Sequence, residues 1–114
     1  MKKHILLLLL ILPLLATSQE RIKVACIGNS VTYGYGHSNP AKTSYPTQLG
    51  KLLGEGYEVG NFGKSGATLL NKGHRPYTKQ PEYKAALDFA PDIAIIHLGL
   101  NDTDPRNWPN YRDE

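Results

Sequence analysis

Residues 21–30, RIKVACIGNS, decide the fold class of this chain, because an apolar run ends there at a glycine and two polar residues. Residues 21–27 begin with polar alternation and become fully apolar, a pattern that predicts a strand buried in a sheet. Gly28 ends the strand, and Asn29 and Ser30 follow at once. The sequence therefore predicts a hydroxyl group at the turn where a buried strand ends.

Two later segments repeat this pattern. Residues 57–62, YEVGNF, predict a second short strand, which leads into residues 63–66, GKSG. Residues 93–98, IAIIHL, run apolar almost without a break and lead into residues 99–102, GLND. A continuous apolar run is typical of a parallel strand that is covered on both faces.

Helices are predicted between the strands. One begins at Ser44 and ends before Gly54, and a shorter one covers residues 82–89. The predicted apolar face of the first helix comprises Leu49, Leu52 and Leu53. The polar segments 29–43 and 67–81 are expected to be loops, the former with room for a short helical turn. Alternating strands and helices indicate a parallel sheet with helices on its faces.

The three polar strand ends are expected to meet, because the carboxyl ends of parallel strands line one edge of an open sheet. Ser30, Gly66 and Asn101 should then lie close together although they are far apart in sequence. A serine at such a turn can act as a nucleophile when a base takes its proton. The main-chain N–H groups of Ser30 and Gly66 and the Asn101 amide supply three donors, which suit an oxyanion hole for acyl transfer.

The three strand ends resemble the first three motif blocks of the SGNH (GDSL-type) hydrolases. The matching residues are 28–30 (GNS), 61–66 (NFGKSG) and 99–102 (GLND), in the family's order and each at a strand end. The resemblance implies a three-layer α/β/α, flavodoxin-like fold with a parallel sheet, of which residues 19–114 form the N-terminal part. It implies no cofactor and no metal. It assigns the nucleophile and the oxyanion hole to Ser30, Gly66 and Asn101.

The chain departs from the family pattern in two places. Asn29 stands where the family usually has aspartate. Asparagine keeps a hydrogen-bond acceptor at this position but lacks the negative charge. The Asp-x-x-His block that supplies the family's base is absent. His37 and His74 lie in predicted loops, and His97 lies in a predicted strand, where it should be structural and face the helices. We therefore expect an N-terminal fragment that is inactive and poorly stable alone.

Residues 1–18 have the pattern of a secretory signal peptide. Lys2 and Lys3 precede a short apolar run, and small residues precede a cleavage point after Ser18. The run is too short for a stable membrane anchor, so a secreted or periplasmic protein is expected. Without the two lysines the net charge falls from +3 to about +1, which gives no sign of a nucleic-acid surface. The single cysteine, Cys26, excludes an internal disulfide and suits a buried strand.

The loops after the second and third strands indicate a substrate. Residues 61–73 and 97–108 are similar to secreted bacterial carbohydrate O-acetylesterases, most of all to the sialate O-acetylesterases of gut bacteria. That resemblance implies an acetylated glycan or acetylated sialic acid as substrate. Trp108 is a candidate for stacking on a sugar, and Arg75 for pairing with the sialate carboxylate. Further candidates are the aromatic residues Tyr35, Tyr77 and Tyr111 and the cations Lys72 and Arg106.

The sequence leaves some other functions open and argues against others. A xylan or pectin acetylesterase and a lysophospholipase-type GDSL esterase remain open, although the polar and aromatic residues 32–45 do not suit a lipid substrate. A secreted glycan-binding module without catalysis also remains open, because the base is missing. The glycines after the first strand do not form a nucleotide-binding motif. Residues 101–107 lack the central glycine and the terminal glutamate of a calcium loop.

Overall fold

The structure, a computed structural model, describes residues 19–114. The predicted signal peptide, residues 1–18, lies outside the described residues and stays a prediction. Between residues 19 and 114 none of the helices has the length and apolar character needed to span a lipid bilayer.

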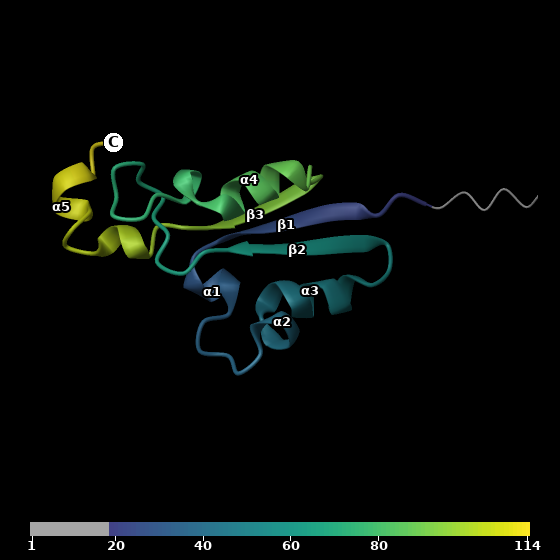
Figure 1. The fold of residues 1–114 in the computed structure, drawn as a ribbon. Coiled ribbons are helices and arrows are strands. Elements are labelled where there is room, and N and C mark those ends of the chain that lie inside the picture. The colour runs from purple at the N-terminus through teal and green to yellow at the C-terminus, as the bar shows by residue number, and fades with distance from the viewer. Residues whose placement is uncertain (1–18) are drawn as a thin grey trace, which may run out of the picture.

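Three parallel strands form one sheet in the order β2-β1-β3 (Figure 1). They are β1 (Ile22–Gly28), β2 (Tyr57–Gly63) and β3 (Ile93–His97). Gly28 pairs with Gly63 on one side and with His97 on the other, so the three strands end at the same level. This common end is called the carboxyl edge below.

Helices cover both faces of the sheet, which confirms the predicted three-layer α/β/α arrangement. In Figure 1 three helices lie below the sheet and α4 lies above it. The helices below are α1 (Ser30–Tyr33), α2 (Pro40–Thr43) and α3 (Tyr45–Leu53), and α4 spans Pro81–Asp88. Three further turns were not predicted: η1 (Tyr77–Lys79), η2 (Asn101–Thr103) and α5 (Trp108–Tyr111).

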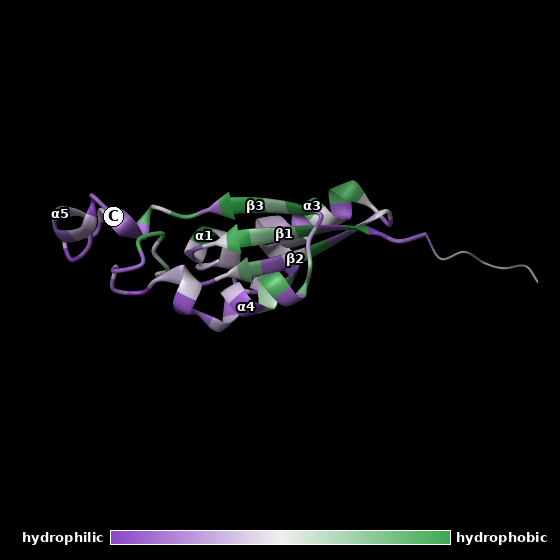
Figure 2. Cartoon of the chain, turned by 90° about the horizontal axis from the view of Figure 1, so that it is seen from above, coloured by the Kyte–Doolittle hydropathy of each residue, from purple (hydrophilic) through white to green (hydrophobic). Residues whose placement is uncertain are grey.

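The core lies around the central strand β1. Val24, Ala25 and Cys26 are buried there, and Ala86 of α4 is buried as well. The buried thiol of Cys26 is confirmed, and burial raises its pKa, opposed by a hydrogen bond from Tyr45. Figure 2 shows hydrophobic residues gathered along β1 and β3, mixed residues along β2, and mostly hydrophilic residues around α5.

The predicted apolar face of α3 is wrong at Leu52, whose exposed fraction is 85%. The helix approaches the sheet at Gly50, where an added Cβ would lie 3.5 Å from the Val59 side chain. Pro46, one turn earlier, is fully buried. Because a residue two positions from Gly50 lies on the opposite side of a helix, Leu52 points away from the sheet.

The prediction that β3 is covered on both faces is also wrong for the described residues. All five residues of β3 are exposed, and Ile96 has an exposed fraction of 64%. β3 lies at one margin of the sheet, while α4 packs over β2 and β1. Residues 19–114 therefore leave this apolar strand open.

Candidate active site

The first loop of the carboxyl edge holds Ser30 as the first residue of α1. Asn29 caps this helix, and its Oδ1 accepts a hydrogen bond from the Val31 N–H at 3.0 Å. The Asn29 N–H donates to the His97 carbonyl at 3.2 Å, which ties the loop to the end of β3. Asn29 thus keeps the local hydrogen-bonding role expected of it. Its Nδ2 is buried without a partner among residues 19–114, so only the oxygen of this amide is used there.

Glycines at the carboxyl edge let α1 lie directly on the strand ends. A Cβ at Gly28 would overlap the Thr32 side chain and come 2.7 Å from the His97 carbonyl oxygen. A Cβ at Gly63 would overlap the main chain of Tyr33. Gly28 does not have a positive φ, so close approach, rather than a special turn conformation, requires glycine there.

The second loop is tied to the first by main-chain and side-chain hydrogen bonds. The Lys64 N–H donates to the Gly28 carbonyl at 2.8 Å. Asn61 of β2 donates from Nδ2 to the Thr32 carbonyl at 2.9 Å, and its Oδ1 accepts from the Gly63 N–H at 2.9 Å. The end of β2 and the helix that begins at Ser30 are therefore held as one unit.

Gly66 lies in a tight turn of the second loop. Its φ is +80°, and the Ala67 N–H closes the turn by donating to the Lys64 carbonyl at 3.1 Å. The N–H groups of Ser30 and Gly66 have no acceptor among residues 19–114. Both main-chain donors are therefore available to a substrate at this edge.

Asn101 begins the 3₁₀ turn η2, after β3. Its Nδ2 donates to the Ala67 carbonyl at 2.9 Å, so the amide lies against the residue that follows Gly66. One N–H of this amide is used in that bond, and the other can serve a substrate. The topology and these hydrogen bonds place the loops of Ser30, Gly66 and Asn101 at one edge of the sheet.

Comparison with known proteins decides the family. The profile of the GDSL-like Lipase/Acylhydrolase family matches residues 26–114. The chain belongs to this family. An acetylxylan esterase of Xylanibacter ruminicola is 52% identical over 93 residues, which are 82% of this chain and 19% of that protein. The chain thus spans about a fifth of the length of this curated relative.

Solved structures of an SGNH-hydrolase family esterase share the fold. The crystal structure of AlinE4, an SGNH-hydrolase family esterase, matches with a TM-score of 0.55 and 31% sequence identity. The match covers 73% of this chain and 42% of AlinE4, and a mutant of AlinE4 gives the same values. The family resemblance and the SGNH fold predicted from the strand ends are confirmed.

Arg75 lies beside the predicted oxyanion donors of this GDSL-like hydrolase. Its Nη1 donates to the Ser65 carbonyl at 2.9 Å. A Cβ at Gly66 would lie 3.1 Å from the same nitrogen, so the guanidinium stands against the glycine. Its side chain is exposed, and the remaining N–H groups of the guanidinium can meet a ligand.

Arg106 and Trp108 are placed differently from Arg75. Arg106 donates to both carboxylate oxygens of Asp104 at 2.9 Å, and this pairing holds the pKa of Asp104 well below its usual range. Arg106 therefore has a partner already, which argues against the substrate-binding role considered for it. Trp108 begins α5 with an exposed fraction of 51%, and among residues 19–114 no side-chain hydrogen bond ties it to the Ser30 loop.

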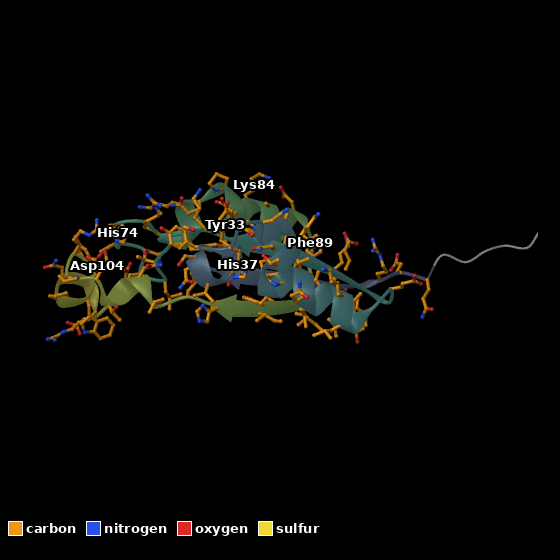
Figure 3. All side chains as sticks on the ribbon, turned by 90° about the horizontal axis from the view of Figure 1, so that it is seen from below. Tyr33, His37, His74, Lys84, Phe89 and Asp104 are labelled. Atoms are coloured by element: carbon orange, nitrogen blue, oxygen red, sulfur yellow. The ribbon has the colours of Figure 1, made fainter. Side chains whose placement is uncertain are left out.

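No histidine between residues 19 and 114 hydrogen-bonds Ser30. His37 Nδ1 lies 2.8 Å from Thr43 Oγ1, and His74 bonds to Asn107. Figure 3 shows His74 near Asp104 and apart from His37. His97 is the last residue of β3 and is exposed, which contradicts the expectation that it faces the helices. In the described part of the chain no group of three His, Cys, Asp or Glu side chains is placed to hold a metal ion.

Two buried residues at this edge were missed by the sequence predictions. Asp102, with an exposed fraction of 4%, accepts hydrogen bonds from the N–H groups of Leu69 at 2.9 Å and Leu70 at 2.7 Å. Asn107, with an exposed fraction of 0%, bonds to both Asn101 and His74. Asp102 belongs to the motif block 99–102, which assigns it no role of its own, and the polar residues up to Asn107 resemble a calcium loop only in part.

Proposed function

We propose that the protein is an SGNH-type serine esterase that removes O-acetyl groups from a carbohydrate. The observation that carries the proposal is the geometry of the carboxyl edge. A serine at a helix start lies there with two unoccupied main-chain donors and with an asparagine amide bound to the Ala67 carbonyl. Family membership supports the reaction class.

The proposed mechanism begins when Ser30 Oγ attacks the acetyl carbonyl carbon while a general base takes the hydroxyl proton. The carbonyl oxygen becomes an oxyanion, which accepts hydrogen bonds from Ser30 N–H, Gly66 N–H and Asn101 Nδ2. The C–O bond to the sugar then breaks, and the sugar oxygen takes the proton from the base. Water repeats the sequence on the acetylated Ser30 and releases acetate. The resemblance to SGNH hydrolases assigns the base to a histidine of an Asp-x-x-His block, and residues 19–114 contain no such block.

We propose acetylated xylan as the first substrate to consider. The support is the 52% identity with a protein named acetylxylan esterase. Arg106, one of the three cations considered as a partner for a sialate carboxylate, is already paired with Asp104.

The proposal is tested by measuring acetate release from acetylated xylan, O-acetylated sialic acid and a long-chain ester with the whole protein. We expect release from the carbohydrate esters, fastest from xylan, and little from the long-chain ester. A preference for the long-chain ester would favour a lysophospholipase-type enzyme. Binding of the glycans without any hydrolysis would favour the non-catalytic module.

Acetylated sialic acid is the second candidate, and the position of Arg75 beside Gly66 favours it. If the guanidinium pairs with the sialate carboxylate, Arg75→Ala should lower kcat/KM on acetylated sialic acid by about 10-fold or more, because a charge-assisted hydrogen bond is lost. An aryl acetate, which has no carboxylate, should be affected much less. Arg21, which pairs with Glu58 and precedes β1 at the far end of the sheet, gives the control variant Arg21→Ala. Equal losses on both substrates would exclude Arg75 from substrate recognition.

We also propose that the protein is secreted or periplasmic. The pattern of residues 1–18 supports this, since a basic start, a short apolar run and small residues at a cleavage point are typical of an exported protein. Export would bring the enzyme to polymeric glycans outside the cell.

A further inference from the structure

We propose that Asn107 is a positioning residue of the oxyanion hole and that it acts through Asn101. The inference rests on the proposed esterase function, because it concerns the same site. Asn107 precedes α5, six positions after Asn101, and has an exposed fraction of 0%. A buried amide costs free energy unless its polar atoms are paired, so its hydrogen bonds show what holds it in place.

The Asn107 amide joins two segments of the carboxyl edge. Its Nδ2 donates to the Asn101 carbonyl at 2.8 Å, and its Oδ1 accepts from the His74 N–H at 2.8 Å. These two main-chain partners determine the orientation of the amide, because a carbonyl can only accept and an N–H can only donate. Nδ2 also lies 2.9 Å from His74 Nδ1, which accepts its second hydrogen when the ring carries its proton on Nε2.

Residues 101–107 hold the loop that follows Gly66. Asn101 donates to the Ala67 carbonyl, and the Asp102 carboxylate accepts from Leu69 and Leu70. Side chains of residues 101–107 therefore bind the loop of residues 67–74 at both of its ends. The turn η1, which follows this loop, is held to β2, since the Tyr77 hydroxyl donates to the Phe62 carbonyl at 2.6 Å.

Asn101 depends on this support because η2 is only three residues long. Its carbonyl accepts from Asn107 Nδ2 and, at 3.2 Å, from the Asp104 N–H. Without the shorter bond, which comes from Asn107, the main chain of Asn101 can rotate. The Asn101 side chain then moves relative to the Ala67 carbonyl. Misplacing a catalytic group by about 1 Å can cost on the order of 100-fold in rate.

The test is a double-mutant cycle of Asn107→Ala and Asn101→Ala in the whole protein, with an aryl acetate as substrate. We expect Asn107→Ala to lower kcat by about 10- to 100-fold and to leave KM within about twofold of the unsubstituted protein. When Asn101→Ala is already present, adding Asn107→Ala should lower kcat almost no further. Asn107→Asp should reproduce the kcat loss. It keeps the acceptor for the His74 N–H and removes the donor to Asn101, in nearly the same volume. It also provides the test if the alanine variant does not fold.

Asn110→Ala is the matched control. Asn110 is an exposed amide in α5, and among residues 19–114 its Nδ2 reaches only the Arg106 carbonyl, at 3.2 Å, so this change should leave kcat unaltered. Additive losses in the cycle, a change confined to KM, or wild-type kcat in Asn107→Asp would each overturn the inference. Failure of the proposed function would look different. The unsubstituted protein would then either hydrolyse no ester or hydrolyse it equally well after Ser30→Ala.

Discussion

Replacing Ser30 with alanine is expected to lower kcat for acetate release by about 10⁶-fold, the order observed when the nucleophile of a serine hydrolase is removed. The change deletes the oxygen that attacks the acetyl carbon, while the main-chain N–H of residue 30 and the Asn101 amide remain. Fold and stability should be preserved, because Ser30 begins α1 and the capping bond is made by Asn29. Initial rates on acetylated xylan and on an aryl acetate give the measurement.

Ser38→Ala is the control, since Ser38 is an exposed serine in the loop between α1 and α2. It should retain full activity. Rapid quenching of the unsubstituted enzyme should also yield a peptide acetylated at Ser30. Residual activity of Ser30→Ala above about one per cent, or an acetyl group found on another residue, would contradict the assignment of the nucleophile.

Replacing Asn101 with alanine is expected to lower kcat by about 100- to 1,000-fold, the usual cost of removing one oxyanion donor. KM should change little, because the donor binds the charge that develops in the transition state more strongly than it binds the ground-state carbonyl. Asn101→Asp should lower kcat at least as much as Asn101→Ala, since a carboxylate in the same place would repel the oxyanion. The kinetic parameters of both variants on an aryl acetate check this expectation.

Asn39→Ala is a matched control for the amide. Asn39 precedes α2, and its side chain makes no capping hydrogen bond there. Thermal melting of all variants separates loss of catalysis from loss of structure, because Asn101→Ala also removes the donor to the Ala67 carbonyl. If kcat falls only in those variants whose melting temperature also falls, the role of Asn101 as an oxyanion donor is contradicted.

Several features of the fold could be predicted because their signals are local. β1 and β3 are largely apolar runs, β2 mixes apolar and polar residues, and the structure ends β1 and β2 at Gly28 and Gly63, within one residue of the prediction. The two longest helices also begin within one residue of their predicted starts, at Tyr45 and Pro81. Parallel topology followed from the alternation of these elements and is confirmed.

Burial was predicted less well, because it depends on which elements pack together. Leu52 fits an apolar helix face in the sequence, yet α3 approaches the sheet through Gly50 and turns this leucine outward. The isoleucines of β3 suit a strand covered on both faces, yet the described helix on that side of the sheet lies over β2 and β1. Composition alone does not say which neighbour an apolar residue will find.

The parallel sheet, the family and the three loops that hold Ser30, Gly66 and Asn101 could all be predicted from the sequence. Those properties come from short apolar runs and from the residues that directly follow them. Only the tertiary structure showed that Asp102 and Asn107 hold the loop after Gly66 through hydrogen bonds between residues 32 or 33 positions apart. Such bonds leave no periodic pattern, because the partners are main-chain groups that every residue carries. These hydrogen bonds can form only after the parallel strands have brought their carboxyl ends to one edge of the sheet.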